Sequence, residues 1–252
     1  MIVSYPDLDE NYLINVSRGY VIGAEPFSGY GKRVTAGAET NVLWPNGAWV
    51  NPPSAGVQMA IVSASASDSA AGTGIRSVEI HYIDANLAEQ AETVTMNGTT
   101  PVNTVATNIR FIQCMHMASY GSGKAAAGNI TATNGGNTYS HISAGGVRCE
   151  SSMRMVPAGK RLMVNAFSAG SSSGAAAAST IINLVVSKFG THDYTADSVF
   201  IPLSSAAAQD GNTTIAIQNP IKIEAGGIFG MTFSTDKVAT IVGAWFGWLE
   251  NA

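Results

Sequence analysis

Charged residues are scarce in this chain of 252 residues. Asp, Glu, Lys and Arg together make up 12% of it, about half the share of an ordinary globular domain. The 13 basic residues are scattered and are outnumbered by 17 acidic ones, which gives a formal net charge of -4. Binding to nucleic-acid phosphates needs a concentrated basic face. We therefore expect no nucleic-acid partner.

Cysteines and long apolar runs are also scarce. Cys114 and Cys149 are the two cysteines, too few for a disulfide scaffold. The apolar run at residues 241–249 is too short to span a bilayer of about 30 Å. The first ten residues carry three acids and no base, unlike a secretory leader. We expect a soluble protein without membrane insertion, made in a cytoplasm and keeping its thiols reduced.

Helical patterns are nearly absent, and the one clear example lies at the N-terminus. Asp7 can cap a helix there, with Glu10 three residues later, and Gly19 is a natural stop. Leu8, Tyr12, Leu13 and Val16 can share one face of this helix. Residues 20–56 are turn-rich and are predicted to form an extended arm or a meander.

What the chain does contain is a repeating pattern of short strands and turns. Residues 77–83 alternate between apolar and polar side chains, which is typical of a half-buried β-strand. A turn follows at residues 84–86, Asn97-Gly98 is a strong hairpin signal, and residues 134–136 repeat it. Further strands are predicted near residues 108–120, 128–142, 161–168, 180–188, 198–203, 213–218, 227–234 and 240–249.

This spacing of strands and turns favours sandwiches over α/β units. An apolar-x-Ala-Gly phrase ends at Gly37, Gly145, Gly159 and Gly226, and two copies lead directly into apolar strands, a pattern common in jelly rolls. The predicted fold class is all-β, with two jelly-roll-like antiparallel β-sandwich domains after a short N-terminal helix and arm. The predicted boundaries are 1–56 for the helix and arm, 57–150 for the first sandwich and 151–252 for the second.

Two motifs resemble catalytic or phosphate-binding loops. Residues 170–174 match G-x-S-x-G, with Ser172 as nucleophile, but the adjacent His192 and Asp193 suit a triad poorly. Residues 121–124 resemble the end of a P-loop but lack its first Gly and its final Ser or Thr. We interpret both as loops and expect no enzyme and no cofactor.

Metal-binding residue types occur without the spacing of a known zinc module. By residue type alone, a Cys2His2 zinc site could be assembled from Cys114, His116, His141 and Cys149. A buried free thiol and a hydrogen-bonded histidine are the favoured interpretation, so no metal is predicted. The carboxylates of Glu79, Glu89 and Glu92 are interpreted as solvated strand faces rather than a glycosidase pair.

Tryptophans lie near the arm and in the last predicted strand. Trp248 follows Trp245 by three positions, so the two rings should point to opposite faces, one into the core and the other free for contact with another chain. Candidate interaction residues are Leu8, Tyr12, Leu13, Trp44, Trp49, Trp245 and Trp248.

The segment SASASDSAAGTGIRSVEIHYIDANLAEQAETVTMNGTTPVNT, residues 63–104, resembles a segment found in many virion proteins of tailed bacteriophages. Residues 81–83 depart from the pattern, where the family often has a Gly-Leu pair, and Met96 replaces a leucine. The positions that match in place are residues 67–68, 70–74, 84–86, 92 and 97–100.

The resemblance covers roughly residues 14–133 and implies a structural part of a phage particle. The leading hypothesis is a capsid decoration or cement protein in the virion, assembled in the host bacterial cytoplasm. It would associate with itself, as a trimer or another homo-oligomer, and contact phage capsid or tail proteins. The alternatives are a tail, baseplate or fibre-attachment component, and a host-glycan-binding module that uses Trp44 or Trp49 as a stacking platform.

Overall fold

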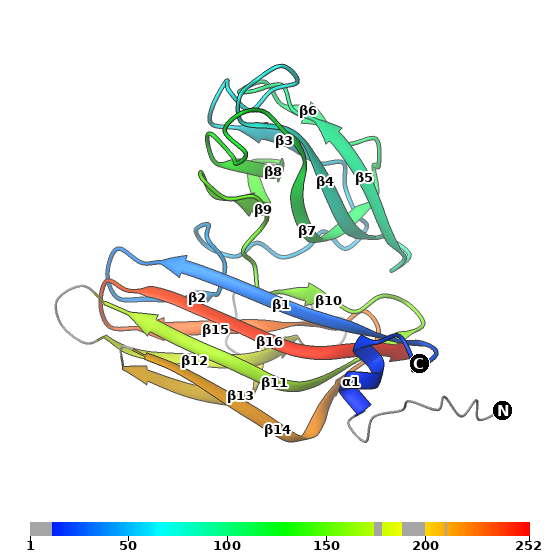
Figure 1. The fold of residues 1–252 in the computed structure, drawn as a ribbon, viewed down its shortest axis with the longest axis vertical. Coiled ribbons are helices and arrows are strands. Elements are labelled where there is room, and N and C mark those ends of the chain that lie inside the picture. Colours follow the sequence, from blue (N-terminus) through cyan, green and yellow to red (C-terminus); the bar gives the residue numbers. More distant parts are fainter. Residues whose placement is uncertain (1–11, 174–177, 188–199, 210) are drawn as a thin grey trace.

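The computed structural model describes residues 12–173, 178–187, 200–209 and 211–252. These residues form antiparallel strands and one short helix, α1 (Tyr12–Ser17), arranged in two stacked lobes (Figure 1). The all-β prediction is therefore confirmed. No helix in the described ranges is long and apolar enough to cross a membrane.

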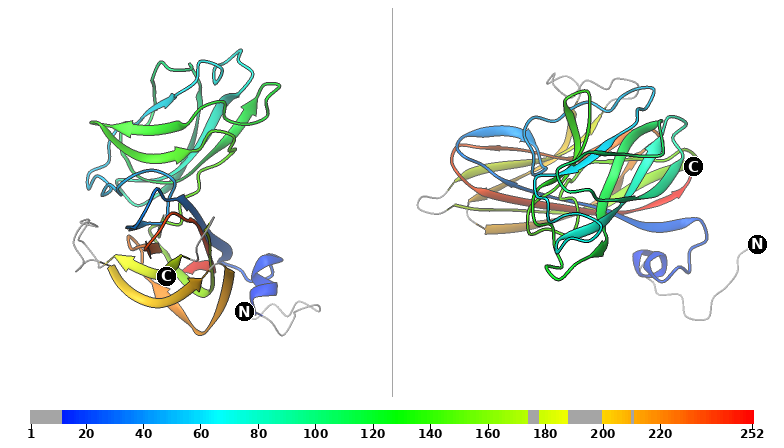
Figure 2. Two further views of the ribbon diagram at one scale, coloured as in Figure 1. Left: turned by 90° about the vertical axis from the view of Figure 1, so that its left-hand side faces the viewer. Right: turned by 90° about the horizontal axis from the view of Figure 1, so that it is seen from above.

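The lower lobe consists of two facing sheets. The first has the strand order β1 (Ala24–Val34), β16 (Thr240–Asn251), β11 (Lys160–Ser172) and β14 (Gly211–Ile223). The second has the order β10 (Arg154–Met155), β15 (Ile228–Thr235), β12 (Ser179–Ser187) and β13 (Phe200–Gln209), with β2 (Glu39–Val42) also pairing with β15. Figure 2 shows α1 on the outside of this sandwich.

β2 and β10 are two parts of one interrupted edge strand, because both pair antiparallel with successive residues of β15. Between them, Leu43 N donates to Met231 O at 2.9 Å and Ser152 N donates to Leu43 O at 3.1 Å. The chain thus leaves the lower lobe after Leu43 and returns at Ser152. The upper lobe is an insertion within this strand.

The prediction of an extended arm before the sandwiches is wrong for residues 24–42. β1 pairs with β16 along its whole length, from Ala24 opposite Glu250 to Val34 opposite Thr240. β2 pairs with β15. The lower sandwich therefore combines strands from both ends of the chain, and the upper sandwich lies between them in sequence.

The upper lobe also consists of two sheets. One has the order β6 (Val102–Asn103), β3 (Ala60–Ser63), β8 (Ile130–Asn134) and β9 (Asn137–Ile142). The other has the order β5 (Glu89–Thr95), β4 (Ile75–Asp84) and β7 (Ile109–Tyr120).

The predicted turns have mixed outcomes. The β4–β5 hairpin turns where predicted, and the Asp84 carboxylate accepts hydrogen bonds from Asn86 N and Ala88 N at 2.8 and 2.9 Å. The β8–β9 hairpin closes over Gly135 and Gly136, both with positive φ. Asn97-Gly98 is also a turn, but it does not close a hairpin because β5 and β6 belong to different sheets.

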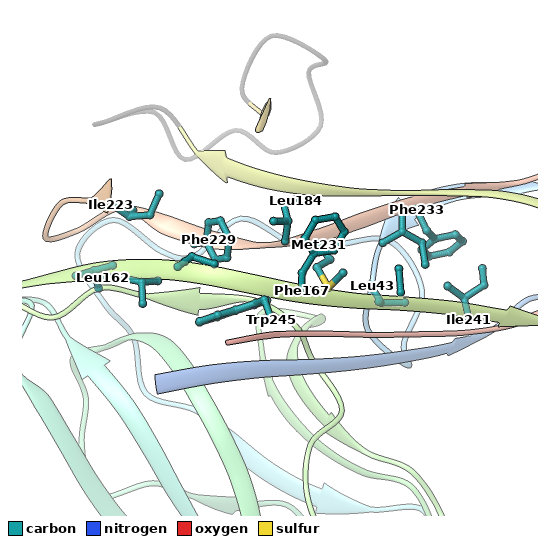
Figure 3. Close-up of a cluster of buried hydrophobic side chains, with 14 of the residues drawn as sticks. Leu43, Leu162, Phe167, Leu184, Ile223, Phe229, Met231, Phe233, Ile241 and Trp245 are labelled. Carbon is teal, nitrogen blue, oxygen red and sulfur yellow. The ribbon is translucent and has the colours of Figure 1, made fainter. Parts of the chain in front are cut away.

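Each lobe has its own apolar core, and a third cluster joins them. In the lower lobe, Phe167, Phe229 and Trp245 are fully buried between the sheets (Figure 3). The core of the upper lobe is built mainly from Ile, Val and Met side chains. The joining cluster contains Val42, Trp44, Ile83, Phe111, Met153, Met155 and Ile228.

A side-chain amide adds a polar link between the lobes. Gln113 of β7 is 4% exposed. Its Nε2 donates to Met155 O at 2.6 Å, and its Oε1 accepts from Met155 N at 3.0 Å. The amide therefore bonds to the β10 backbone in the same way as a neighbouring strand would. The N–H and C=O groups of the buried Met155 both gain a hydrogen-bond partner.

Candidate contact face

The outer face of the first lower sheet is flat and carries small side chains. Directly paired residues on neighbouring strands share a face, so the register defines its rows. Two adjacent rows contain no charged residue, and we call them the outer sheet face: Ser28, Phe246, Ala166 and Ala216, then Tyr30, Ala244, Ser168 and Thr214. The next row adds Lys32 beside Val242, Gly170 and Asn212.

Strand alternation explains why these residues face outward. In β16, Ile241, Trp245 and Leu249 enter the core, which turns Ala244 and Phe246 to the other side. Two aromatic rings stand out among the small residues, because Phe246 is 48% exposed and Tyr30 is 37% exposed. Single exposed apolar residues are normal on a monomer, but these two lie on adjacent rows of one uncharged face.

α1 lies against one end of this face and forms a groove with it. The Tyr12 ring lies 5.3 Å from the Trp248 ring, at an interplanar angle of 58°. Val16 is buried, and Gly19 ends the helix with a φ of 72°, as the sequence predicted. The groove has a volume of about 290 Å³ and is lined by Val16, Ser17, Pro26, Phe27, Ser28, Asn165, Phe246 and Gly247.

Only part of the predicted interaction set lies near this face. Tyr12 is 44% exposed, and Trp248 packs beneath it and donates from Nε1 to Glu250 Oε2 at 3.0 Å. Leu8 lies outside the described residues, and the described part of Leu13 is its backbone in α1. Tyr12 and Trp248 thus mark the helix end of the outer sheet face.

Burial excludes a contact role for Trp44 and Trp245, and Trp245 is the member of the Trp245 and Trp248 pair that enters the core. Trp245 is fully buried, and its Nε1 donates to Ser152 O at 2.7 Å. Trp44 is 1% exposed, and its Nε1 donates to Gly47 O at 2.9 Å. Neither ring can contact another chain. Trp245 and Trp248 do lie on opposite faces of β16, as predicted.

Trp49 belongs to the cluster that joins the two lobes. Its ring meets the Trp44 ring edge-on at 5.3 Å and lies 6.3 Å from the Phe111 ring. Trp44 has no open ring face on which a sugar could stack, and Trp49 is half-buried in the same cluster. These rings stabilise the junction between the lobes instead.

The segment that resembles phage virion proteins contains a buried structural anchor, Asp68. Its carboxylate is fully buried and accepts four hydrogen bonds, from Ser63 Oγ at 2.6 Å and from the backbone N–H groups of Ile75, Ala127 and Gly128 at 2.8 to 3.0 Å. A Cβ at Gly74 would lie 2.1 Å from Asp68 Oδ1. Glycine is therefore required beside the carboxylate.

The loop that resembles a P-loop packs on the same segment. Gly121 N donates to Gly74 O at 2.8 Å, and Gly123 N donates to Thr73 O at 2.7 Å. These N–H groups are used within the fold, whereas a P-loop directs its N–H groups at phosphate. The interpretation of this motif as a structural loop is confirmed.

The G-x-S-x-G motif begins in an extended strand. Ser172 pairs with Thr240 at the end of β11, whereas a nucleophile elbow needs a sharp turn at the serine. Gly174, His192 and Asp193 lie outside the described residues. The strand conformation at Ser172 does not present a nucleophile in the way that a hydrolase requires.

The fold does not bring the four residues of the possible Cys2His2 site, Cys114, His116, His141 and Cys149, together around one point. The Sγ atoms of Cys114 and Cys149 lie 2.6 Å apart. This contact lowers the pKa of the buried Cys149 thiol and raises that of Cys114. His116 instead lies near Glu79, and His141 is buried at the junction between the lobes, where burial and the charge of Arg33 lower its pKa.

Comparisons with known proteins give no family. No protein-family model matches the chain, and no curated protein matches it. One similar solved structure is "Structure of infectious bursal disease virus Gx strain", at 7% identity and a TM-score of 0.20, covering 90% of this chain and 71% of that one. Another is "Structure of infectious bursal disease virus Gt strain", at 11% identity and a TM-score of 0.16, covering 98% and 73%.

Proposed function

We propose that this chain is a structural protein of a bacteriophage particle and that it acts as a capsid decoration or cement protein. The observation that carries the proposal is the outer sheet face, an uncharged surface of small side chains with Phe246 and Tyr30 exposed on it. The resemblance of residues 63–104 to phage virion proteins supports the same role.

The strand order of the lower lobe fits this role. Counting β2 and β10 as one strand gives eight described strands in two sheets, and the chain changes sheet at almost every connection. We infer that the lobe is a jelly roll, a fold that recurs in viral capsid domains. The upper lobe, inserted in an edge strand, then forms a projection at the β1 and β10 edge of this jelly roll (Figure 1).

The proposed occupant of the outer sheet face is a second copy of the same chain. The two rows bring no charge of their own into the contact, so the desolvation cost is confined to the charged residues at the Tyr30 edge, where burial and the charge of Glu150 raise the pKa of Tyr30 and the charge of Arg148 lowers it. Ala, Ser and Thr side chains lose little conformational entropy when they are fixed in a contact. Phe246 and Tyr30 supply the aromatic anchors on which interface energies commonly depend.

Sedimentation of the purified chain tests this occupant. Phe246→Glu places a charge at the centre of the face and should convert the oligomer to monomer. Val105→Glu is the matched control, because Val105 is 90% exposed on the upper lobe, and it should leave the oligomer unchanged. A monomeric wild-type chain, or an oligomer that persists in Phe246→Glu, would refute self-association through this face.

Labelling of intact phage particles tests the role itself. Gold-labelled antibody against this chain should decorate the whole head in electron micrographs if the chain is a cement protein. Label confined to the tail or to one vertex would support the tail, baseplate or fibre-attachment alternative and refute the cement role. Purified particles that carry no label would refute a virion role altogether.

A further inference from the structure

Glu79, His81 and His116 form a compact cluster on the upper lobe. His81 Nε2 lies 3.0 Å from Glu79 Oε1, and His116 Nε2 lies 3.4 Å from Glu79 Oε2. The two imidazole rings are stacked, with centroids 5.2 Å apart. One ligand atom from each residue lies within 4.8 Å of the other two.

The strand register places these side chains together. Glu79 and His81 are two positions apart on β4 and therefore share a face. His116 of β7 is the direct cross-strand partner of Glu79. On the opposite face, Ile80 and Met115 are fully buried in the upper core. The backbone beneath the cluster is thus fixed by packing, so three ligands are presented without rearrangement of the strands.

The three side chains are close enough to share one small cation. Metal–ligand bonds of 2.0 to 2.1 Å in a tetrahedron place neighbouring ligand atoms about 3.3 Å apart. Each imidazole nitrogen lies 3.0 or 3.4 Å from a different oxygen of Glu79, Oε1 for His81 and Oε2 for His116, and one ligand atom from each residue lies within 4.8 Å of the other two. Binding of one ion by all three residues therefore requires the side chains to draw together by about 1 Å.

The donor set selects the class of metal. Two imidazole nitrogens and one carboxylate oxygen suit Zn²⁺ and similar borderline divalent ions, whereas Mg²⁺ and Ca²⁺ prefer oxygen ligands. Glu79 supplies the negative charge, and the three side chains are 35 to 39% exposed. An ion can therefore reach the three side chains from solvent.

Two neighbouring residues, Arg148 and Cys114, affect how many ligands the site can offer and how strongly it attracts a cation. Arg148 pairs with His116 across the neighbouring segment, and its positive charge opposes a bound cation. Cys114 is the cross-strand partner of His81, but its sulfur is in contact with Cys149. The cluster therefore offers three ligands from its own residues, and a water or an external donor would complete the tetrahedron.

We propose that Glu79, His81 and His116 bind one Zn²⁺, or a similar borderline divalent ion, and thereby cross-link β4 to β7. This proposal replaces the expectation from sequence that the chain binds no metal. It is independent of the proposed role in the particle, because it requires only the upper lobe and solvent.

Calorimetric titration of the metal-free full chain with Zn²⁺ tests the site. We expect saturable binding of one equivalent and no binding of Mg²⁺ or Ca²⁺. Glu79→Gln, His81→Ala and His116→Ala should each weaken the affinity for Zn²⁺ by at least about tenfold. Glu89→Gln removes an exposed carboxylate from β5 of the same sheet, so this control should leave the affinity unchanged within about twofold.

Histidine resonances of the wild-type chain provide a second measurement that does not depend on any variant folding. Zn²⁺ should shift the imidazole signals of His81 and His116 and leave the signal of the buried His141 in place. Absence of saturable Zn²⁺ binding would overturn the proposal. So would binding that survives all three ligand substitutions but is lost in Cys149→Ser, since that result would assign the ion to the thiol pair.

Discussion

The two lobes are both antiparallel β-sandwiches, but their interiors are stabilised differently. The lower lobe buries large aromatic rings between its sheets, among them Phe167, Phe229 and Trp245. The largest buried side chains of the upper core are Ile and Met residues and Tyr82. That lobe also contains a fully buried carboxylate, Asp68, which accepts hydrogen bonds from the backbone of two separate segments, at Ile75 and at Ala127 and Gly128.

The lobes also differ in the strands of one sheet. In the upper lobe, β4 and β7 have 10 and 12 residues, but every strand of the other sheet is short. β1, β11, β14 and β16 have 11 to 13 residues, so long rows of side chains can meet between two sheets. β3 and β6 have four and two residues, and long loops complete the upper sandwich. Loops carry backbone groups without strand partners, and Asp68 satisfies several of them. A small sandwich with long loops thus depends on polar anchors as well as on apolar burial.

The largest expected effect is the loss of an aromatic ring from the lower core. Phe167→Ala should lower the free energy of unfolding by about 4 kcal/mol, because it leaves a cavity between the sheets. Ile181→Ala is the matched control, because Ile181 of β12 is 46% exposed on the other sheet of the same lobe, and it should change the free energy of unfolding by less than about 1 kcal/mol. Urea unfolding followed by tryptophan fluorescence measures both. Equal effects of the two substitutions would contradict the assignment of the core.

Removal of the upper anchor should have the next largest effect. Asp68→Ala leaves the buried N–H groups of Ile75 and Gly128, and the part-buried N–H of Ala127, without their acceptor, which should cost about 3 kcal/mol. Asp236→Ala is the matched control, because Asp236 is exposed and accepts one hydrogen bond, from Ser179 N, and it should cost less than about 1 kcal/mol.

Hydrogen exchange separates the two lobes in this comparison. Asp68→Ala should accelerate amide exchange in β3, β4 and β8 more than in β11 and β16. An acceleration confined to the lower lobe, or none at all, would show that the upper lobe does not depend on its polar anchor.

A smaller loss of stability is expected when the hydrogen bonds that link the two lobes through Gln113 are removed. Gln113→Ala removes both hydrogen bonds to the Met155 backbone, and because Met155 is fully buried this should cost about 2 kcal/mol. Gln90→Ala is the control on exposed β5 and should be neutral within about 0.5 kcal/mol. Faster amide exchange in β10 should accompany the loss of stability, and unchanged exchange there would contradict a linking role for Gln113.

The sequence predicted the strands that have an apolar and a polar face, but not β1. The inward positions of β1 include Gly29 and Gly31, because Trp245 and Leu43 fill the space beside them. A Cβ at Gly29 would lie 2.4 Å from Trp245 Nε1, and one at Gly31 would lie 2.4 Å from Leu43 O. A strand whose core face is glycine has no hydrophobic period to detect, so residues 24–34 resembled an arm.

Long-range pairing explains why the sites were not predicted. The sequence shows Cys114 and His116 two positions apart, but the register of β4 against β7 brings Glu79 and His81 to them. The outer sheet face likewise comes from four strands, and two of them, β1 and β16, come from opposite ends of the chain. Alternation within one strand shows which residues share a face, but it does not show which strand lies beside it.

The smallest expected effect concerns acid pH at the junction between the lobes. His141 of β9 is 7% exposed, and its pKa is lowered by burial and by the positive charge of Arg33 on β1 of the lower lobe. The unfolded chain therefore binds a proton at this histidine more readily than the folded chain does. The contribution of neutral His141 to stability is present above the ordinary histidine pKa of about 6.5, and it is lost as the pH falls below that value towards the folded pKa.

Urea unfolding between pH 7.5 and pH 5 measures this loss. The wild-type chain should become less stable over the range, and His141→Gln should flatten the dependence because it removes the titrating group. Gln90→Ala is the matched control, because Gln90 is exposed on β5 of the upper lobe and has no titrating group, and it should leave the slope in place. If the free energy of unfolding of His141→Gln still falls with pH as steeply as that of the wild-type chain, the acid sensitivity belongs to other groups. The junction between the lobes would then make no contribution to the pH dependence of stability.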